Sequence, residues 1–284
     1  MRTYPKISIV LLFLFIIIGS STASGKLKLV ILHTNDTHSQ VEPRDKSTLA
    51  SSDMGGYARR MGVVNKIRAE EKNVLLFDAG DFSQGSPYFN FYNGRIEIDA
   101  INKMKYDAIT LGNHEFDNGI DTLAVILSKA TVPVVSSNYE ISQTAIAPYV
   151  KPYYIIRKFG LKIGIIGLCV QPKSLIIESN HKGLTYDDPI EIANKMATFL
   201  KKEKKCDLII CLSHLGSDKK SEEVNDFVIA RNTKYIDVII GGHSHSMIED
   251  ERELNLDGKE VLISQMAKSG LYLGRIDLEM ERKK

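Results

Sequence analysis

Five short groups of Asp, His and Asn residues each follow an apolar stretch that is typical of a buried β-strand. Such side chains supply the oxygen and imidazole ligands that divalent metal ions bind in proteins. The groups are Asp36-Thr-His38, Gly80-Asp81, Gly112-Asn-His-Glu115, Ser213-His214 and Gly242-His-Ser-His245. One such histidine alone is more often a surface or core residue than a ligand, but five groups at corresponding places indicate one shared metal site.

The spacing within these groups favours their convergence. Asp36 and His38 are two residues apart, as are His243 and His245, and in extended backbone such pairs point to the same side. In an open α/β sheet, functional groups gather beyond the carboxyl ends of the strands, so ligands that are distant in sequence meet there. The sequence therefore predicts a metal centre at one edge of a sheet.

The charges of these groups indicate what the centre would do. Two divalent ions about 3.5–4 Å apart repel each other and need a bridging carboxylate, for which Asp81 is the natural candidate. Because Asp36 and Asp81 are the only charged ligands, the two metal ions with their ligands keep a net positive charge. This charge attracts phosphate and lowers the pKa of a bound water. The expected reaction is in-line attack of a metal-bound hydroxide on phosphorus. Imidazole and oxygen ligands together favour Zn²⁺, Mn²⁺ or Fe over Mg²⁺ or Ca²⁺.

A departing alcohol also needs a proton donor or additional positive charge close to the metal ions. His114 is next to the candidate ligand Asn113 in the sequence, which places it for this role. Asp117 follows three residues later and is a suitable partner to orient the imidazole ring. His114 and Asp117 are therefore the predicted catalytic pair.

The elements that must position these groups alternate along the chain. Short apolar runs rich in β-branched residues alternate with longer segments of helical periodicity, which predicts an α/β fold. The expected strands are Leu27–Leu32, Val74–Phe77, Ala108–Leu111, Val132–Val135, Lys162–Leu168, Leu208–Leu212 and Ile236–Ile240. Most of them are apolar almost throughout, which is typical of strands covered on both faces.

Helices and loops are expected between these strands. Apolar residues at helical spacing predict one helix through Tyr57, Met61, Val64 and Ile67, and another through Ile192, Met196 and Leu200 after an Asp188-Pro189 start. The polar segment Ser39–Gly56 and the Gly-, Pro- and aromatic-containing segment Ser83–Gly94 predict two long surface loops. A last strand is expected within Leu271–Leu278.

The N-terminal residues have the pattern of a secretory signal peptide. Arg2 and Lys6 precede an apolar stretch, Ile9–Ile18, and a run of small residues that ends at Ser24. The stretch is shorter than the roughly 18–20 residues of a membrane span, although an uncleaved anchor is the alternative. We expect residues 1–24 to be a signal peptide and residues 25–284 a single catalytic domain, exported to the periplasm or secreted.

Composition excludes several other classes of protein. Hydrophobic residues at 43% and charged residues at 25% are ordinary for a globular protein and argue against disorder or a coiled coil. The formal charge of +2 falls to 0 when Arg2 and Lys6 are removed, so no basic excess favours polymeric nucleic acid as a partner. The odd set of cysteines, Cys169, Cys206 and Cys211, is expected to be buried thiols and not a disulfide.

The candidate residues resemble motifs of the calcineurin-like metallophosphoesterases, and more closely of their exported 5′-nucleotidase branch. The motifs are Ile31-Leu-His-Thr-Asn-Asp-Thr-His38, Phe77-Asp-Ala-Gly-Asp-Phe-Ser-Gln-Gly85, Leu111-Gly-Asn-His-Glu-Phe-Asp117, Ser213-His-Leu-Gly216 and Gly241-Gly-His-Ser-His245, in the family's order. The resemblance covers almost the whole mature chain. It implies two packed mixed β-sheets flanked by helices, with the metal-binding loops at one edge.

The resemblance also implies a role for each candidate residue. The residues around one metal ion would be Asp36, His38, Asp81 and His245, and those around the other would be Asp81, Asn113, His214 and His243. His114 and Asp117 match the family's catalytic dyad. His245 stands where Gln or Asn is frequent in the family, and a stronger nitrogen ligand there would shift the metal preference.

The leading hypothesis is an exported, dinuclear metal-dependent enzyme that hydrolyses phosphate monoesters, with 5′-nucleotides as the expected substrates. Exported 5′-nucleotidases usually continue into a nucleotide-specificity domain; here the sequence stops at Lys284, so we expect that domain to be absent or supplied by a separate chain. One alternative is hydrolysis of 2′,3′-cyclic nucleotides, other phosphodiesters or a sulfate ester. Another is a metal-dependent binding subunit without turnover.

Overall fold

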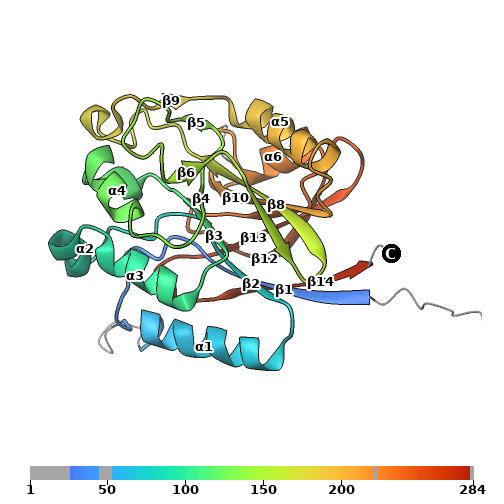
Figure 1. Cartoon of the computed structure of the whole chain (residues 1–284), viewed down its shortest axis with the longest axis horizontal. Helices are drawn as coiled ribbons and strands as arrows, with labels where there is room; N and C mark the ends of the chain where they lie inside the picture. The colour runs from blue at the N-terminus through green and yellow to red at the C-terminus, as the bar shows by residue number, and fades with distance from the viewer. Residues whose placement is uncertain (1–25, 45–52, 221–222, 282–284) are drawn as a thin grey trace, which may run out of the picture.

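The computed structural model describes residues 26–44, 53–220 and 223–281. Within them the chain forms two six-stranded β-sheets that pack face to face, with helices on the outer side of each sheet (Figure 1). The α/β class and the two packed mixed sheets are thereby confirmed. The expected signal segment, 1–24, lies outside the described residues. In the described part of the chain, no helix is both long and apolar enough to cross a membrane.

The first sheet has the strand order β14-β1-β2-β3-β4-β6. Its strands are β1 (Lys26–Thr34), β2 (Val74–Asp78), β3 (Ala108–Thr110), β4 (Val134–Val135), β6 (Val150–Lys151) and β14 (Gly274–Glu281). All neighbouring strands from β1 to β6 are parallel, and β14 pairs with β1 in the antiparallel direction. The carboxyl ends of the parallel strands therefore lie at the same edge.

The second sheet has the order β12-β13-β11-β10-β8-β7. Its strands are β7 (Tyr154–Lys158), β8 (Leu161–Cys169), β10 (Leu208–His214), β11 (Val238–Ile240), β12 (Met247–Leu254) and β13 (Glu260–Met266). The four inner strands are parallel, and β7 and β12 are antiparallel edge strands. A small antiparallel sheet joins β5 (Tyr139–Glu140) and β9 (Thr185–Tyr186).

Helices cover the outer faces of both sheets. The helices are α1 (Tyr57–Glu70), α2 (Pro87–Tyr92), α3 (Arg95–Met104), α4 (Ile120–Leu127), α5 (Pro189–Lys202) and α6 (Asp226–Asn232), with the short 3-10 segments η1 (His114–Phe116) and η2 (Glu178–His181). Residues of α1, α3 and α4 pack on the first sheet, and residues of α5 and α6 pack on the second. Figure 1 shows α1 at the bottom and α5 and α6 at the top.

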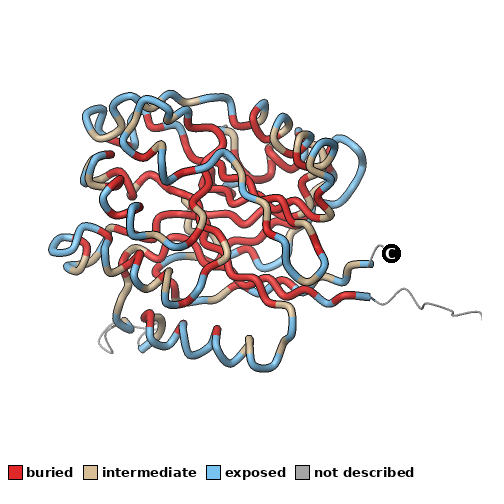
Figure 2. The backbone as a smooth tube through the Cα atoms, viewed as in Figure 1, coloured by how far each residue is buried: buried red, intermediate tan, exposed pale blue. Residues whose placement is uncertain are grey.

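Successive residues of the central strands bury opposite faces. On β1, Leu29 faces the second sheet while Val30 faces the helices. On β10, Ile210 faces the first sheet while Ile209 faces the helices. Each buried side chain of this size stabilises the fold by about 1.5–3 kcal/mol. Figure 2 shows the result, with buried residues along the strands and exposed residues along the outer helix surfaces. Burial on both faces explains the almost continuous apolar runs.

The seven strands predicted between Leu27 and Ile240 are all found, with boundaries that differ by at most two residues. The last predicted strand, Leu271–Leu278, is found as β14, Gly274–Glu281, which begins and ends three residues later than predicted. The prediction of a loop for all of Ser83–Gly94 is wrong, because residues 87–92 form α2. Pro87 has the fixed backbone angle that suits a first helical position, and Asn93 ends the helix in the left-handed conformation with φ 55°.

Candidate metal centre and active site

The predicted ligands lie on loops from both sheets. Asp36 and His38 follow β1, Asp81 follows β2 and Asn113 follows β3, all in the first sheet. The others belong to the second sheet: His214 is the last residue of β10, and His243 and His245 follow β11. The packing of the two sheets brings these loops together at the carboxyl ends of the strands. Six of the seven predicted ligands form two adjoining groups, and the seventh, Asn113, lies against His243 of the second group.

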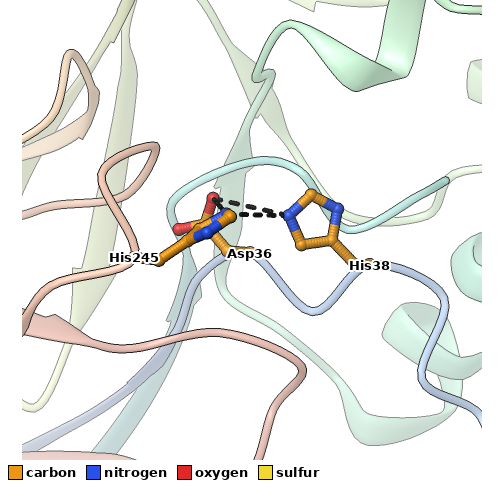
Figure 3. Close-up of side chains that lie close together, drawn as sticks. All are labelled: Asp36, His38 and His245. Carbon is orange, nitrogen blue, oxygen red and sulfur yellow. Dashed lines mark hydrogen bonds and ion pairs between the residues drawn. The ribbon is translucent and has the colours of Figure 1, made fainter. Parts of the chain in front are cut away.

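The first group consists of Asp36, His38 and His245, which each offer a ligand atom within 4.8 Å of the others. His38 Nε2 lies 3.0 Å from His245 Nε2, and His245 Nε2 lies 3.4 Å from Asp36 Oδ1. Figure 3 shows the two imidazole rings and the carboxylate turned toward one another. The ligand atoms therefore converge as those of a metal site do.

The second group consists of Asp81, His214 and His243, whose ligand atoms also lie within 4.8 Å of one another. His214 Nε2 is 3.0 Å from Asp81 Oδ2, and His243 Nδ1 is 3.1 Å from Asn113 Oδ1. Asp36 Oδ1 lies 3.9 Å from His214 Nε2, so the two groups adjoin.

The buried ring of His214 tests whether a cation fits this arrangement. Its Nδ1 donates a hydrogen bond to the carbonyl oxygen of Ala79 at 2.7 Å, which leaves Nε2 to face the carboxylate of Asp81. Nε2 is buried, and its approach to Asp81 Oδ2 at 3.0 Å does not have the geometry of a hydrogen bond. Burial alone would lower the pKa of His214, but the negative charge of Asp81 raises it to about 10. A divalent cation bound by neutral His214 and ionised Asp81 would satisfy both side chains as well as a proton on His214 does. The donor set therefore fits a metal ion.

Five of the predicted ligands have an unusual backbone conformation. Residues with left-handed φ values are Asp36 (47°), His38 (45°), Asp81 (53°), His243 (70°) and His245 (54°). Outside glycine this conformation costs on the order of 1–3 kcal/mol per residue and persists only where the surroundings hold it. Its repetition at residues that face one another indicates a functional site.

Glycines next to the ligands are required by close approach. A Cβ atom added to Gly112 would collide with Asp81 Oδ1, and one added to Gly242 would lie only 2.7 Å from His214 Nδ1. Any side chain at either position would displace a candidate ligand.

The predicted catalytic pair lies beside the first group. Segment η1 places His114 and Asp117 on one side of a 3-10 turn, with His114 Nδ1 2.8 Å from Asp117 Oδ2. The hydrogen bond to Asp117 raises the pKa of His114. The His114 ring centre is 5.4 Å from that of His38, and the backbone N–H of His114 donates to Asp81 Oδ1 at 2.9 Å. The pair is therefore held against the candidate metal ligands.

Glu115 has a part in the site that its sequence position did not reveal. Its buried carboxylate accepts hydrogen bonds from the backbone N–H groups of Asp81, Ser83 and Gly112 at 2.9, 3.0 and 2.6 Å, and from Ser83 Oγ at 2.9 Å. Burial raises the pKa of Glu115 to about 7. These bonds tie the loop after β2 to the loop after β3. An acidic residue beside candidate ligands was the only signal for this role in the sequence.

A cavity of about 540 Å³ opens beside the second group. It lies between the segments that follow β8 and β10 and the start of α5. Residues of mixed character line it, among them Lys173, Leu175, Tyr186, Asp188, Glu223 and His243. His243 thus connects the candidate metal centre to a space large enough for a small molecule.

The sequence matches the family model described as calcineurin-like phosphoesterase over residues 29–247. It is 34% identical to the snake venom 5′-nucleotidase of Crotalus adamanteus over 93% of this chain and 47% of that protein. The chain spans about half the length, or less, of the curated relatives it matches.

Solved structures agree with these sequence matches. The 5′-nucleotidase precursor from Thermus thermophilus has a TM-score of 0.80 and 32% identity, covering 90% of this chain and 52% of that one. The calcineurin-like phosphoesterase YfkN from Bacillus subtilis has a TM-score of 0.75 and 30% identity, covering 91% and 87%. The matched residues 29–247 include every predicted ligand and both members of the predicted catalytic pair.

Proposed function

The chain belongs to the calcineurin-like phosphoesterase family, and from this premise we propose that it is a metal-dependent phosphoric ester hydrolase that acts on 5′-nucleotides. The convergence of two Asp- and His-containing groups, in which five of the six residues have left-handed backbone, supports this function most directly. A binding subunit without turnover would have no need for the hydrogen-bonded His114 and Asp117 beside these groups.

Two divalent ions would occupy the adjoining groups. The residues that would hold them are Asp36, His38, Asp81 and His245 for one ion, and Asp81, Asn113, His214 and His243 for the other. When bound, such ions offset the charge of phosphate oxygens and lower the pKa of a coordinated water. The predominance of imidazole ligands favours Zn²⁺, Mn²⁺ or Fe.

His114 would give a proton to the oxygen of the leaving group. Its Nδ1 is engaged by Asp117, which leaves Nε2 as the atom that carries the proton to be transferred. Asp117 also keeps the ring in one orientation, since the two atoms are only 2.8 Å apart. Proton transfer of this kind contributes roughly 10²–10⁴-fold to a reaction rate.

The nucleoside part of a substrate would enter the cavity next to His243. Its volume of about 540 Å³ lies within the roughly 300–1,000 Å³ that small-molecule sites occupy. Leu175 and Tyr186 offer apolar and aromatic surface for a base, while Asp188, whose Oδ1 caps α5, would accept from a hydroxyl group through its other oxygen. The relatives from Crotalus adamanteus and Thermus thermophilus are named as 5′-nucleotidases, which supports the same substrate class.

The proposed place of action is outside the cytoplasm, in the periplasm or the surrounding medium. The basic residues, apolar stretch and small residues of segment 1–24 support export. Expression of the full chain, with N-terminal sequencing of the protein found in each fraction, tests this. A protein that keeps Met1–Ser24 and stays in the cytoplasm contradicts it.

Phosphate release by the purified protein tests the activity. Metal-free protein is supplied with Mn²⁺ or Zn²⁺ and offered AMP, 4-nitrophenyl phosphate and 2′,3′-cyclic AMP. We expect metal-dependent release from AMP, with His114→Ala retaining its metal but losing turnover. Opening of the cyclic ester gives a phosphate monoester and no free phosphate, so its hydrolysis is followed by chromatography of the nucleotides. No hydrolysis of any of the three esters would exclude the hydrolase, whereas hydrolysis of the cyclic ester alone would reassign the substrate.

A further inference from the structure

Gln265 is a buried amide in β13, a strand of the second sheet that is otherwise largely apolar and lies beside β11. We propose that Gln265 is a positioning residue that holds His243 and His245 together and so keeps both metal positions in register. This role rests on the proposed function, because it concerns the same two groups of ligands. The sequence singled out Gln265 for no role.

Both polar atoms of the Gln265 side chain bind the loops that carry candidate ligands. Its Nε2 donates to the carbonyl oxygen of Gly242 at 2.9 Å and to Ser217 Oγ at 2.9 Å. Its Oε1 accepts from the backbone N–H of Ser246 at 2.6 Å and from Ser244 Oγ at 3.0 Å. One side chain thereby fixes the loop after β11 and links it to the loop after β10.

The contacts alternate with the ligands along the loop. Gln265 holds residues 242, 244 and 246, whereas the residues between them, His243 and His245, belong to the candidate metal groups. Both histidines are in the left-handed region, at φ 70° and 54°. Because such backbone needs external support, the hydrogen bonds from Gln265 to the residues before, between and after the two histidines hold them in this conformation.

The consequence reaches both metal positions. His245 belongs to the group with Asp36 and His38, and His243 to the group with Asp81 and His214. The backbone N–H of His243 also donates to both carboxylate oxygens of Asp36, at 3.1 and 3.0 Å. A loop that loses the support of Gln265 therefore moves one ligand of each group, and both metal ions should bind more weakly.

Gln265→Glu is the sharpest test. The substitution keeps the size of the side chain, but a carboxylate cannot donate to the Gly242 carbonyl. Mn²⁺ is titrated into metal-free protein at pH 8 by calorimetry, and the Mn²⁺ pair is followed by electron paramagnetic resonance. We expect binding at both positions to weaken about 10–100-fold, the range seen when residues that orient ligands are changed. The spectrum of two coupled Mn²⁺ ions should also be lost, while circular dichroism is unchanged.

Asn255→Asp is the matched control, since it makes the same change of amide to acid in the turn of the same hairpin. Asn255 is buried and accepts from the backbone N–H groups of Asp257 and Lys259 at 2.9 and 3.0 Å. This variant should bind Mn²⁺ like the unaltered protein. An equal loss in both variants overturns the proposal, because a general effect on the hairpin then explains it.

Ser244→Ala decides the matter if Gln265→Glu does not fold. It removes only the hydroxyl that joins Ser217 N, at 2.9 Å, to Gln265 Oε1, at 3.0 Å. A smaller loss at both metal positions supports the proposal, and unchanged affinity overturns it. If the unaltered protein binds no Mn²⁺, both the proposed function and the role of Gln265 fail. If the unaltered protein binds Mn²⁺ and hydrolyses AMP, and a folded Gln265→Glu variant binds Mn²⁺ equally well, only the role of Gln265 fails.

Discussion

Asp36 holds a central place among the candidate ligands. Its Oδ1 lies 3.4 Å from His245 Nε2, 3.9 Å from His38 Nε2 and 3.9 Å from His214 Nε2. Nitrogen atoms from both groups therefore face one carboxylate oxygen. Asp81 was the predicted bridge between two metal ions, and the position of Asp36 makes its negative charge important to both groups as well.

We predict that Asp36→Asn weakens metal binding at both positions by on the order of 100-fold or more, since even residues behind the ligands contribute 10–100-fold. The amide keeps the shape of the side chain but removes a charge that offsets two cations. Metal content after dialysis, measured by mass spectrometry, checks the outcome. Loss of only one ion per chain would contradict the central place of Asp36.

Asp117→Asn should lower turnover of AMP by about 10²–10⁴-fold, as expected when a proton donor is no longer oriented. Metal content should not change, because Asp117 belongs to neither group of metal ligands. Asn118→Ala is the neighbouring control: its amide donates to Asn93 Oδ1, at 3.1 Å, and its removal should leave the rate unchanged. Similar rates for both variants would remove Asp117 from the mechanism.

The identity of the candidate ligands could be predicted from residue type and spacing, whereas the roles of Glu115 and Gln265 could not. A candidate ligand such as His214 comes directly after an apolar run in the sequence, and that pattern is local. The partners of Glu115 and Gln265 are mostly backbone N–H and carbonyl groups of other loops, which carry no signal in residue type. Only the folded chain brings those atoms together.

At the scale of elements, most central strands were predicted, whereas the inner strand β13 and the edge strands β6, β7 and β12 were not. A strand such as β10 is buried on both faces, so its residues are apolar almost without interruption. By contrast β12, Met247–Leu254, lies at a sheet edge and consists mostly of exposed or half-buried polar residues. Its sequence resembles a surface segment, and only pairing with β13 makes it a strand.

The carboxylate of Glu115 fastens two of the site loops to each other, and Glu115→Ala should expose this as lost stability. Its removal leaves four buried donors without an acceptor. Each orphaned donor costs about 1–3 kcal/mol, so we expect the free energy of unfolding to fall by more than about 3 kcal/mol. Urea unfolding followed by circular dichroism checks this. Glu70→Ala, on the exposed side of α1, should change it by less than about 0.5 kcal/mol.

The segment after β8 supplies a cation to the cavity beside His243. Lys173→Ala should lower kcat/KM for AMP about two- to fivefold, chiefly through KM, because one exposed charge contributes about 0.5–1 kcal/mol. The loss should shrink in high salt. Lys103→Ala is the control, since Lys103 lines a different cavity, between α1 and α3. An equal change in KM for both variants would show that AMP does not use the cavity beside His243.

At the scale of the molecule, periodicity predicted alternating strands and helices but not the division of the strands between two sheets. That division follows from contacts between residues distant in sequence, such as those of β3 in the first sheet with β8 and β10 in the second. The resemblance implied two packed sheets, and the family match and the fold bear this out. The division matters for function, because each group of candidate ligands takes residues from both sheets.

Metal ions bound at this junction should stabilise the whole fold. Binding to the folded chain alone contributes about 2.7 kcal/mol when free metal is 100 times Kd. For a chain of this size that corresponds to a rise in Tm of roughly 5–10 °C. We expect Mn²⁺ to raise the Tm of metal-free protein by this amount and EDTA to reverse it, with Mg²⁺ less effective because the ligands are rich in imidazole.

Circular dichroism should not change on chelation, since the three apolar clusters that hold the sheets and helices together contain none of the candidate ligands. A Tm that does not respond to Mn²⁺ would mean that no metal ion joins the two sheets.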